Sequence, residues 1–535
     1  MHPSTDDTRL EQLVTTMTAR MAHITRTLGT WVQEAPHDLQ AIEEHVLRLV
    51  KELGATLLAG LCTLLTPAHP ARTVPCPCGH AAAYQRQRPA TVTTILGSLT
   101  VERPYYLCAT CGQGQHPLDA ELDLCAGSRS AGLDELLALL GATHDSFADA
   151  TTVLERLTLV HVSPNGARAA TEALGAVLLA DQTQHATAAQ AGQGRPAADP
   201  VPPPRLYITM DGVLAHLHAQ GWSEVKVGCC YQTHTRPERK RPERLEIRAH
   251  SLSYVTALAE AETFGWHLWQ EAARRGVQDA SEVVVVGDGA HWIWNLADLH
   301  FPGATQIIDW YHASQYVWGA ANAIWGDTHP RREAWAQRQL DQLWAGQVAE
   351  VLAELEPYQA AGEGVTAALS YYTTHRGRMD YAAYRARGLQ VGSGSVESGC
   401  KQLVSARLKG AGMIWDAPGA EAVATVRAWL KSERWAEAMA LRPPRTRRYQ
   451  RQHPPREPEV DAAEGPAAPE APDAGDQRAA AAPETRRLPT AMVAQVRAEL
   501  AAAQAQHPWR KAWSRKRQRA QHAAPREDSR TALAA

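Results

Sequence analysis

Apolar residues recur at helical spacing near the start of the chain. In the segment "LQAIEEHVLRLVKELGATLL", one stripe of a helix would carry Ile42, Val46, Leu49, Val50 and Leu53. Such a stripe packs in a core or pairs with a partner helix, and periodicity alone does not decide between them. The pattern predicts an N-terminal helical region over residues 1–70.

The pattern changes to strict alternation in the next segment. Two alternating runs, "ATVTTIL" and "LTVERPYYL", are divided by Gly97 and Ser98, which predicts a β-hairpin. Two cysteine pairs bracket this hairpin: Cys76 and Cys78 before it, Cys108 and Cys111 after it. Zn²⁺ takes four thiolate or imidazole ligands in a tetrahedron, so residues 71–125 are predicted to form a zinc-ribbon-like module.

The first cysteine pair has the spacing C-x-C, where C-x₂-C is usual. His80 could therefore replace Cys76 as the fourth ligand of Zn²⁺. The alternative interpretation is a set of buried cysteines that bind no metal.

Short helices are predicted over residues 130–180. Ser146 and Ser163 stand where helix N-caps are expected, and Pro164 follows at a first helical position. Two such helices joined by a short turn are typical of a helix-turn-helix-like region, and a plain three-helix bundle is the alternative. The polar, Ala-rich and Pro-rich residues 181–204 read as a linker.

Residues 205–435 alternate between apolar strands and helices. The expected order is three strands, a helix, a strand, a helix and a strand, which is the order of an RNase H-like α/β domain. "THTRPERKRPE" is expected as a basic loop between the second and third strands, and a helix is expected from Tyr254 to Arg275. Trp-rich helical sequence over about 313–389 interrupts the domain. The predicted fold class is therefore multidomain α+β.

Composition places most of the chain among globular proteins. The 535 residues are 44% hydrophobic and 21% charged, and the formal net charge is −3. No apolar run approaches the ~20 residues of a membrane span, and the acidic N-terminus is unlike a signal peptide. Nine cysteines in a chain of this kind indicate a reducing compartment. Residues 436–535 are Pro/Ala/acid-rich and predicted to be largely disordered, with a basic segment at 510–519.

Two aspartates carry the main chemical signal. Asp211 and Asp288 are each expected at the end of an apolar strand, and each is followed by Gly. An unpaired buried carboxylate costs several kcal/mol, so a cation is expected to hold such groups together. Carboxylates with open coordination positions suit Mg²⁺ or Mn²⁺, and two such ions can activate a nucleophile and stabilise the leaving oxygen of a phosphodiester.

A third carboxylate stands in the Gly-rich segment "QVGSGSVESGCKQLVSARLKGAGMIW". Glu397 is the candidate third metal ligand, and the glycines Gly392, Gly394 and Gly399 would let the chain approach the site closely. The cations that follow are predicted to contact DNA phosphates: Lys401, Arg407 and Lys409.

These blocks together resemble the ISKra-type insertion-sequence transposases, a DDE group akin to the Mutator-like enzymes. The resemblance rests on "MDG" at 210–212, "GDGA" at 287–290, "DWYH" at 309–312 and "GSGSVESGCKQLVSARLKGAGMIW" at 392–415, with "LTVERPYYLCATCGQGQHPLDAELDL" upstream. It spans roughly residues 40 to 435, and "HPWRKAW" near the end also fits.

The resemblance implies an RNase H-like catalytic domain with an all-helical insertion before the last acid. It implies that Asp211, Asp288 and Glu397 form the DDE triad. Asp309 and His312 match the family's Asp-x₂-His signature, for which a structural or DNA-end-positioning role is expected.

The implied function is metal-dependent cleavage and strand transfer at the ends of an insertion sequence. Double-stranded DNA, as element terminal inverted repeats and target, is the expected partner. A homodimer or larger assembly on DNA, no membrane, and a cytoplasmic, nucleoid-associated location are also expected. The alternatives are a DNA-binding regulator with an inactive RNase H-like scaffold and a structure-specific nuclease.

Overall fold

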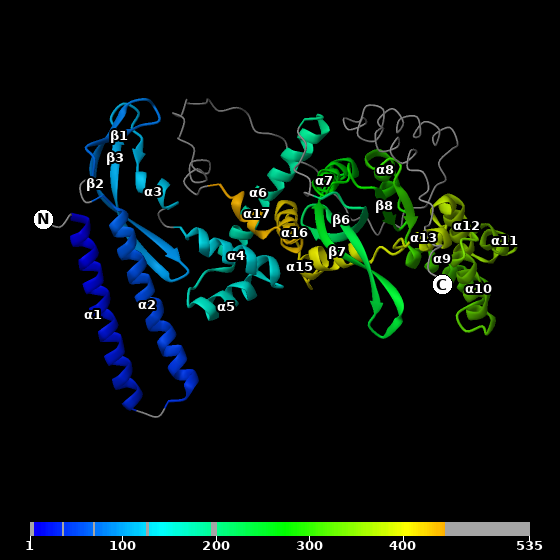
Figure 1. The fold of residues 1–535 in the computed structure, drawn as a ribbon, viewed down its shortest axis with the longest axis horizontal. Coiled ribbons are helices and arrows are strands. Elements are labelled where there is room, and N and C mark those ends of the chain that lie inside the picture. Colours follow the sequence, from blue (N-terminus) through cyan, green and yellow to red (C-terminus); the bar gives the residue numbers. More distant parts are fainter. Residues whose placement is uncertain (1–4, 35–36, 68–69, 125–127, 194–200, 444–535) are drawn as a thin grey trace, which may run out of the picture. The chain divides into compact units, whose positions relative to one another are not determined.

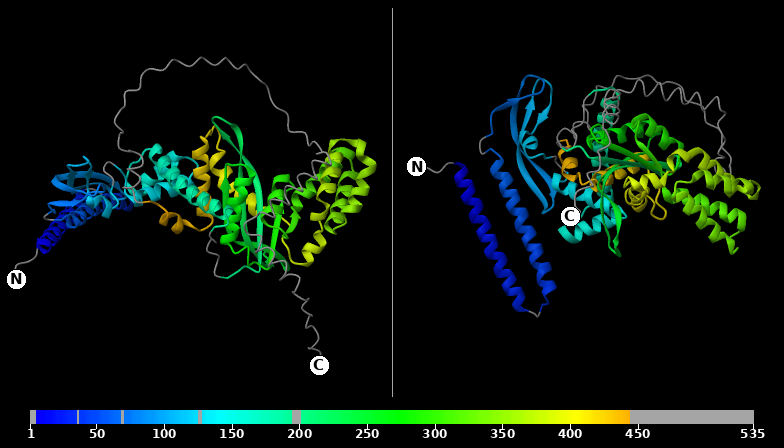
Figure 2. Two further views of the ribbon diagram at one scale, coloured as in Figure 1. Left: turned by 90° about the horizontal axis from the view of Figure 1, so that it is seen from above. Right: turned by 45° about the vertical axis from the view of Figure 1, so that its right-hand side comes forward.

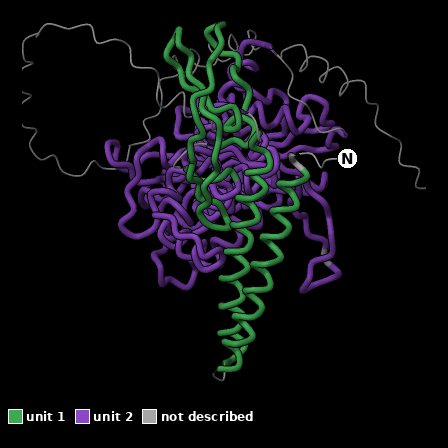
Figure 3. The backbone as a smooth tube through the Cα atoms, turned by 90° about the vertical axis from the view of Figure 1, so that its left-hand side faces the viewer, with its two compact units in different colours: residues 1–131, 443–501 green, residues 132–442, 502–535 purple. Residues whose placement is uncertain are grey.

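The computed structural model describes residues 5–34, 37–67, 70–124, 128–193 and 201–443. The chain divides into two compact units, one with residues up to Ala131 and one with Gly132–Arg442 (Figure 3). Both contain helices and a sheet, so the protein is a multidomain α+β protein. The basic segment 510–519 and nearly all of the predicted tail lie outside the described residues. No helix among the described residues is long and apolar enough to cross a membrane.

The first unit contains a helical hairpin and a small sheet. Helices α1 (Thr5–Glu34) and α2 (Leu39–Leu65) run side by side in Figure 1. The sheet has the order β1-β2-β3-β4 and is antiparallel throughout. Its strands are β1 (Thr73–Pro75), β2 (Ala81–Thr94), β3 (Gly97–Cys108) and β4 (Gly114–Gln115), and a short helix α3 (Pro117–Glu121) follows.

The predicted hairpin of this unit is confirmed, whereas the helical stripe is only partly covered. Strands β2 and β3 pair from Ala82↔Cys108 to Thr94↔Gly97. Helix α2 contacts α1 and β3, yet none of its residues is buried. Val46 and Val50 are exposed, because one helix and one sheet leave part of the α2 surface in solvent.

The second unit begins with three helices. Helix α4 (Ala131–Thr143) is followed by α5 (Phe147–Thr158) and α6 (Pro164–Gln190). The predicted N-caps are confirmed: Ser146 accepts from the Asp149 N–H and Ser163 from the Gly166 N–H. Helix α6 extends ten residues into the predicted linker, since the Ala and Gln residues there favour helix.

A five-stranded mixed sheet forms the centre of this unit, with the order β7-β6-β5-β8-β9. β6 is antiparallel to β5 and β7, whereas β8 and β9 run parallel to β5. The elements follow the expected succession: β5 (Arg205–Leu217), β6 (Gly221–Glu238), β7 (Arg241–Ala257), α7 (Ala261–Arg274), β8 (Glu282–Gly287), α8 (His291–His300) and β9 (Thr305–Ile308). The four valines of β8 are buried, as a strand covered on both faces requires.

Three sequence predictions within this sheet are wrong. Asp211 lies in the middle of β5, because β5 continues pairing with β6 as far as Leu217↔Gly221. The predicted basic loop is an extension of strands β6 and β7. The predicted helix at Tyr254 begins only at Ala261, because β7 pairs with β6 as far as Lys226↔Ala257.

Helices fill the chain between β9 and Glu397, as predicted, and they gather together in both views of Figure 2. They are α9 (Trp310–Trp325), α10 (Arg331–Trp344), α11 (Val348–Leu355), α12 (Glu363–His375) and α13 (Tyr381–Ala386), with short 3₁₀ turns at Glu356–Ala361 and Arg376–Arg378. After them come α14 (Gly394–Gly399), a π-helical turn (Cys400–Ser405), α15 (Ala406–Leu408), α16 (Ala417–Lys431) and α17 (Trp435–Ala440).

Two buried arginines attach helix α4 to this C-terminal segment. The Nε of Arg407 donates to the Gly141 carbonyl at 3.0 Å, and Arg427 donates to the Ala142 carbonyl. The Arg407 guanidinium also lies 4.4 Å from the ring centre of Phe147 and 4.9 Å from that of Trp415. A cation suits this position, because carbonyls at a helix C-terminus carry partial negative charge.

This environment corrects the prediction that Arg407 contacts DNA. Its side chain is 1% exposed. Burial, and then the neighbouring Arg427, lower its pKa to about 10. A guanidinium enclosed by a helix end and two aromatic rings is not free to meet a phosphate.

Replacing Arg407 by Gln should lower the free energy of unfolding by about 2–4 kcal/mol, because buried partners lose their cation. The exposed Lys409→Gln protein is the matched control and should change stability by less than ~0.5 kcal/mol. Urea unfolding of both proteins measures the difference. Equal stabilities would contradict the structural role assigned to Arg407.

Candidate metal centres

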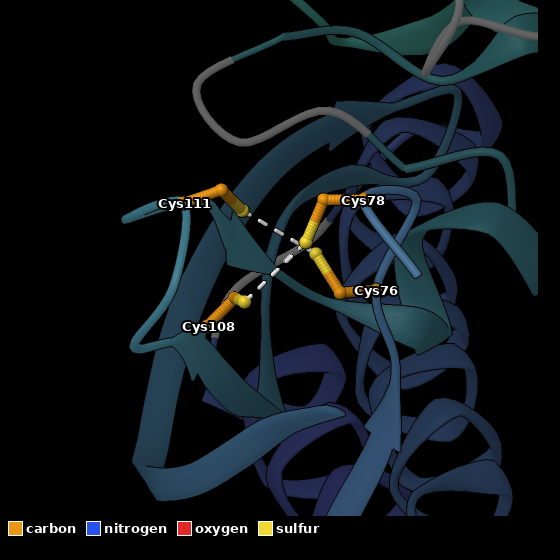
Figure 4. A group of neighbouring side chains, drawn as sticks. All are labelled: Cys76, Cys78, Cys108 and Cys111. Atoms are coloured by element: carbon orange, nitrogen blue, oxygen red, sulfur yellow. Dashed lines mark hydrogen bonds between the residues drawn. The ribbon is translucent and has the colours of Figure 1, made fainter. Parts of the chain in front are cut away.

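Four cysteines of the first unit converge at one end of its sheet (Figure 4). Cys76 and Cys78 lie between β1 and β2, and Cys108 and Cys111 lie at the turn between β3 and β4. We call these four residues the thiol cluster. Their sulfur atoms lie within 4.8 Å of one another, and none of the four forms a disulfide.

Two similar turns hold the thiol cluster. In the first, the Cys76 N–H donates to the His80 carbonyl at 2.7 Å, and the chain turns through Gly79 at φ +87°. In the second, the Cys108 N–H donates to the Gln113 carbonyl at 3.0 Å, and the chain turns through Gly112 at φ +70°. Glycine suits both positions, because other residues rarely adopt positive φ.

The sulfur spacing fits a shared metal ion. Cys76 and Cys111 have their Sγ atoms 3.6 Å apart, as have Cys78 and Cys108. A disulfide needs about 2.05 Å, whereas thiolates 2.3 Å from a tetrahedral ion stand about 3.8 Å apart. The thiol cluster could therefore hold a metal ion without rearrangement of its backbone.

Two of the thiols are prepared for ionisation. A backbone hydrogen bond from His80, and then the Cys111 side chain, lower the pKa of Cys78 to about 6. A backbone hydrogen bond from Cys111 is the main cause that lowers the pKa of Cys108. Metals bind the thiolate form, so these hydrogen bonds favour metal uptake near neutral pH.

The structure also bears on the open choice between Cys76 and His80. Cys76 belongs to the group whose ligand atoms lie within 4.8 Å of one another, and His80 does not. His80 instead places its Nδ1 3.6 Å from the Cys78 sulfur. It is therefore a hydrogen-bonding neighbour of one thiol, and Cys76 completes the set of four.

A second group of titratable residues gathers where the parallel strands β8 and β9 end, beside the middle of β5. Its members are Asp211, Asp288, Asp309, His312 and Glu397, and we call them the acidic cluster. Asp211 comes from β5, Asp288 follows β8, Asp309 follows β9, His312 lies in α9 and Glu397 in α14. Within the cluster, Asp309, His312 and Glu397 have ligand atoms within 4.8 Å of one another and could hold a metal ion.

Asp309 is the most buried member, at 1% exposed. One carboxylate oxygen accepts from the His312 backbone N–H at 2.8 Å and lies 3.1 Å from its Nδ1. The other accepts from the Ser393 backbone N–H. Burial alone would raise the pKa of Asp309, but the hydrogen bonds from His312 and Ser393 outweigh burial and lower it. The same contact with Asp309 raises the pKa of His312.

Ser393 connects Asp309 to Glu397 through hydrogen bonds. Its hydroxyl donates to the Glu397 carboxylate at 3.1 Å, and its backbone is fixed by Asp309. The adjacent chain is also held, since the Trp310 N–H donates to the Val391 carbonyl at 3.0 Å. Asp309 thus positions Glu397 through one intervening residue.

Asp211 and Asp288 lie beside this group, and the carboxylate of Asp288 acts on that of Asp211. Burial, and then the nearby carboxylate of Asp288, raise the pKa of Asp211. One Asp211 oxygen accepts from the Gly212 N–H at 2.7 Å, and the other lies 3.5 Å from the Cys400 sulfur. Asp288 accepts from the Ala290 N–H at 2.9 Å and, with Glu397, contributes to the raised pKa of His312.

The structure therefore brings the predicted residues to one region. The residues whose ligand atoms lie closest together, however, are not the three predicted metal ligands. Glu397 groups with Asp309 and His312, which the sequence suggested as signature residues and not as ligands. Asp211 and Asp288 lie outside the group of described residues whose ligand atoms are within 4.8 Å of one another. Lys401 and Lys409 are exposed, as a contact with phosphate requires.

The three glycines around Glu397 differ in how closely other atoms surround them. A side chain at Gly399 would meet the Tyr254 ring at 2.9 Å and Val227 at 3.4 Å, so only glycine lets α14 lie this close to the sheet. At Gly392 the nearest atom is an Asp309 oxygen at 3.9 Å, and at Gly394 nothing lies within 4 Å. The close approach expected of all three is needed at Gly399, against the protein's own sheet.

Sequence reasoning missed three side chains of this region. Ser393 and Cys400 both stand in the Gly-rich segment, four residues before and three after Glu397, which is the spacing of one helix face. That spacing could have identified them. The Tyr371 hydroxyl donates to the Asp288 carbonyl at 2.6 Å from a distant helix, and no local pattern could have shown this contact.

Comparison with known families covers both centres. A model of an uncharacterised protein family, UPF0236, matches residues 37–438. The chain belongs to this family. No curated protein matches the sequence. The thiol and acidic clusters of this UPF0236 protein both lie within the matched range, so both belong to the part of the chain that family membership covers.

The thiol cluster predicts metal content. The UPF0236 protein purified under reducing conditions should contain about one tightly bound metal ion per chain, measured by elemental analysis. Cys108→Ser should lose most of it, because one of four ligands is gone. Cys62→Ser is the matched control, since Cys62 lies outside the cluster, and it should keep the ion. Metal-free wild-type protein would contradict this interpretation.

The Asp309–His312 pair predicts a pH-dependent stability. The lowered pKa of Asp309 means that its contribution is present above pH ~4 and is lost as pH falls through the lowered value. The raised pKa of His312 means that its contribution is present below pH ~6.5 and is lost as pH rises through the raised value. The pair should contribute most between about pH 4 and 6.5.

Asp309→Asn should therefore cost about 1–3 kcal/mol of unfolding free energy near pH 5.5 and less at pH 9. The exposed Asp341→Asn protein serves as control and should show no such pH dependence. Urea unfolding at several pH values measures both. A cost that is the same at both pH values would show that the charged pair is not the source.

Proposed function

We propose that this protein is a DDE transposase of the ISKra type, which cuts and joins DNA at the ends of an insertion sequence. The observation that carries the proposal is the acidic cluster. Asp309, His312 and Glu397 have ligand atoms within 4.8 Å of one another, and the carboxylates of Asp211 and Asp288 lie beside them. Like charges repel, so such a set is stable when a cation binds among its members.

The architecture supports an RNase H-like assignment for this region. Three antiparallel strands are followed by a helix, a parallel strand, a second helix and a second parallel strand. The helices α9–α13 stand between this sheet and the last acid, where the all-helical insertion of such transposases is expected. Glu397 then returns to the sheet, because Gly399 allows close contact with β6 and β7.

The donor set fits Mg²⁺ or Mn²⁺, which prefer oxygen ligands. Asp211, Asp288 and Glu397 are the proposed ligands, and Asp309 positions Glu397 through Ser393. When bound, such ions lower the pKa of an attacking water or 3′-hydroxyl and stabilise the leaving oxygen of a phosphodiester. The raised pKa of Asp211 agrees with this role, because its charged form is disfavoured without a nearby cation.

The thiol cluster supports a zinc-ribbon-like module in the first unit. Four thiolates in a tetrahedron are the preferred ligand set of a structural Zn²⁺ site. We assign this module and the helix-turn-helix-like helices α4–α6 to recognition of the element's terminal inverted repeats. Cleavage of two ends in one event requires at least a dimer on double-stranded DNA.

The exposed cations near Glu397 supply the complementary contacts. Lys401 stands four residues after Glu397, and the Lys409 ammonium lies 5.9 Å from the ring centre of the exposed Trp222. Phosphates would repel a site made only of carboxylates, so lysines at its margin are needed for DNA to approach. Arg407 takes no part, since it is buried.

The acidic cluster predicts a separation of cleavage from binding. Asp211→Ala, Asp288→Ala and Glu397→Gln should each reduce Mg²⁺-dependent cleavage of element ends by at least ~100-fold, because a metal ligand is lost. Each should bind the same DNA as tightly as wild type or slightly more tightly, because a negative charge is removed. Glu350→Gln, an exposed change on α11, should leave both properties unaffected.

Labelled element ends in a cleavage and strand-transfer assay provide the measurement, with a binding titration in parallel. A Glu397→Gln protein that cuts at the wild-type rate would overturn the proposal. Cleavage by wild type without any joining would favour a structure-specific nuclease. Binding with no cleavage by wild type would favour a DNA-binding regulator.

A further inference from the structure

Strands β6 and β7 continue beyond the sheet as a two-stranded ribbon. Strand β5 covers β6 only between Gly221 and Tyr231. Past that point β6 and β7 pair with each other alone, from Gln232↔His250 to Glu238↔Arg241. The ribbon, residues 232–250, projects from the sheet of its unit in Figure 1.

The two faces of the ribbon differ in chemistry. Residues that pair directly across two antiparallel strands share a face. Three pairs place neutral residues on one face: Thr233 and Ala249, Thr235 and Ile247, Pro237 and Leu245. The pairs that alternate with them place polar and charged residues on the other: Gln232 and His250, His234 and Arg248, Arg236 and Glu246.

Positive charge is concentrated on this ribbon. Residues 232–250 contain six Lys and Arg against three Glu, whereas the whole chain has 54 against 57 acidic residues. Glu246 is shared by Arg236 at 2.8 Å and Arg248 at 2.9 Å, so one acid offsets two cations on the shaft. At the tip, Arg239, Lys240 and Arg241 are exposed.

Packing does not explain the ribbon. A two-stranded hairpin alone is marginally stable in water, and the leucine at its tip, Leu245, is 72% exposed. Its outer part adds no buried residue to the core of the unit, since residues 232–250 are all exposed or half-buried where described. Its shape, sign of charge and exposure instead suit an extended anionic partner.

We propose that the ribbon is an arm that binds the backbone and groove of duplex DNA. The major groove is about 12 Å wide and admits a two-stranded β-ribbon. The charged face and the three tip cations would meet phosphates there. This inference rests on the proposed function for the identity of the DNA, which is the duplex adjoining the bond that is cut.

The sheet register gives the distance at which the arm acts. The tip at Arg239 is four residues of β5 and eight of β6 away from Asp211, counted through the Tyr207↔Tyr231 pair. At ~3.3 Å per residue this path is at most roughly 40 Å, since the register shifts of β6 shorten it, and it corresponds to about one turn of duplex DNA. The arm therefore contacts DNA about one helical turn from the cleavage position, away from the acidic cluster.

The test is a binding titration of full-length protein with a duplex element end at several salt concentrations. Replacing Arg239, Lys240 and Arg241 by Ala should weaken binding at least ~10-fold at 0.1 M salt. If all three contact phosphates, it should also reduce the salt-dependence slope by about 2.7. The matched control is Arg239→Lys with Arg241→Lys, which keeps the charge and should keep the slope. Because the three tip residues are exposed, their replacement should not unfold the protein, so weaker DNA binding would not be due to unfolding. Melting temperatures of the variants check this.

If the triple Ala substitution left the salt-dependence slope of DNA binding unchanged, the proposal that the ribbon binds DNA would be wrong. Hydroxyl-radical footprinting supplies the second readout, with protection about one turn from the cut site that disappears in the same variant. Protection that persists there would also overturn it. If the arm variant loses this protection but wild-type protein never cuts DNA, the arm stands and the proposed transposase activity fails. If wild-type protein cuts DNA and the triple Ala variant binds DNA as tightly as wild type, the transposase activity stands and the arm fails.

Discussion

The buried carboxylate of Asp309 is the contact on which the second unit's candidate site depends. It lies where β9 ends and α9 begins, and it accepts hydrogen bonds from both the helix and the Ser393 segment. In the sequence, the helices α10–α13 separate the Ser393 segment from β9 and α9. A buried carboxylate without such donors would be costly, so the hydrogen bonds stabilise the charge and the charge holds the segments. These hydrogen bonds hold the Ser393 segment, and with it Glu397, beside the ends of β8 and β9.

The thiol cluster follows the same logic with different atoms. Two turns with positive-φ glycines bring four sulfur atoms within bonding reach of one ion, and backbone N–H groups stabilise two of them as thiolates. In each unit, therefore, backbone hydrogen bonds prepare charged side chains that repel one another. A bound cation is the natural partner of both arrangements, which links local backbone geometry to the proposed DNA chemistry.

Sequence patterns predicted which helices and strands exist better than the residues at which they begin and end. The hairpin between the cysteine pairs, the serine N-caps of α5 and α6 and the succession of strands and helices follow from local periodicity and capping. The limits depended on distant partners. Asp211 lies within β5 because β6 pairs on past it, and the basic segment after Tyr231 is strand because β7 pairs with it. Arg407 looked like a phosphate ligand from its charge, yet the end of α4 and two aromatic rings enclose it. The contact of Tyr371 with the Asp288 carbonyl joins two distant segments, and no local pattern reports it.

The proposed transposase activity requires that the acidic cluster bind divalent cations for phosphodiester chemistry. The most direct measurement is a crystal of the protein soaked with Mn²⁺ and examined by anomalous scattering. We expect an anomalous peak among the carboxylates of Asp211, Asp288 and Glu397, beside Asp309 and His312, and we expect it to weaken in a Glu397→Gln crystal. A fully soaked crystal with no peak there, or with a peak that Glu397→Gln leaves unchanged, would contradict it.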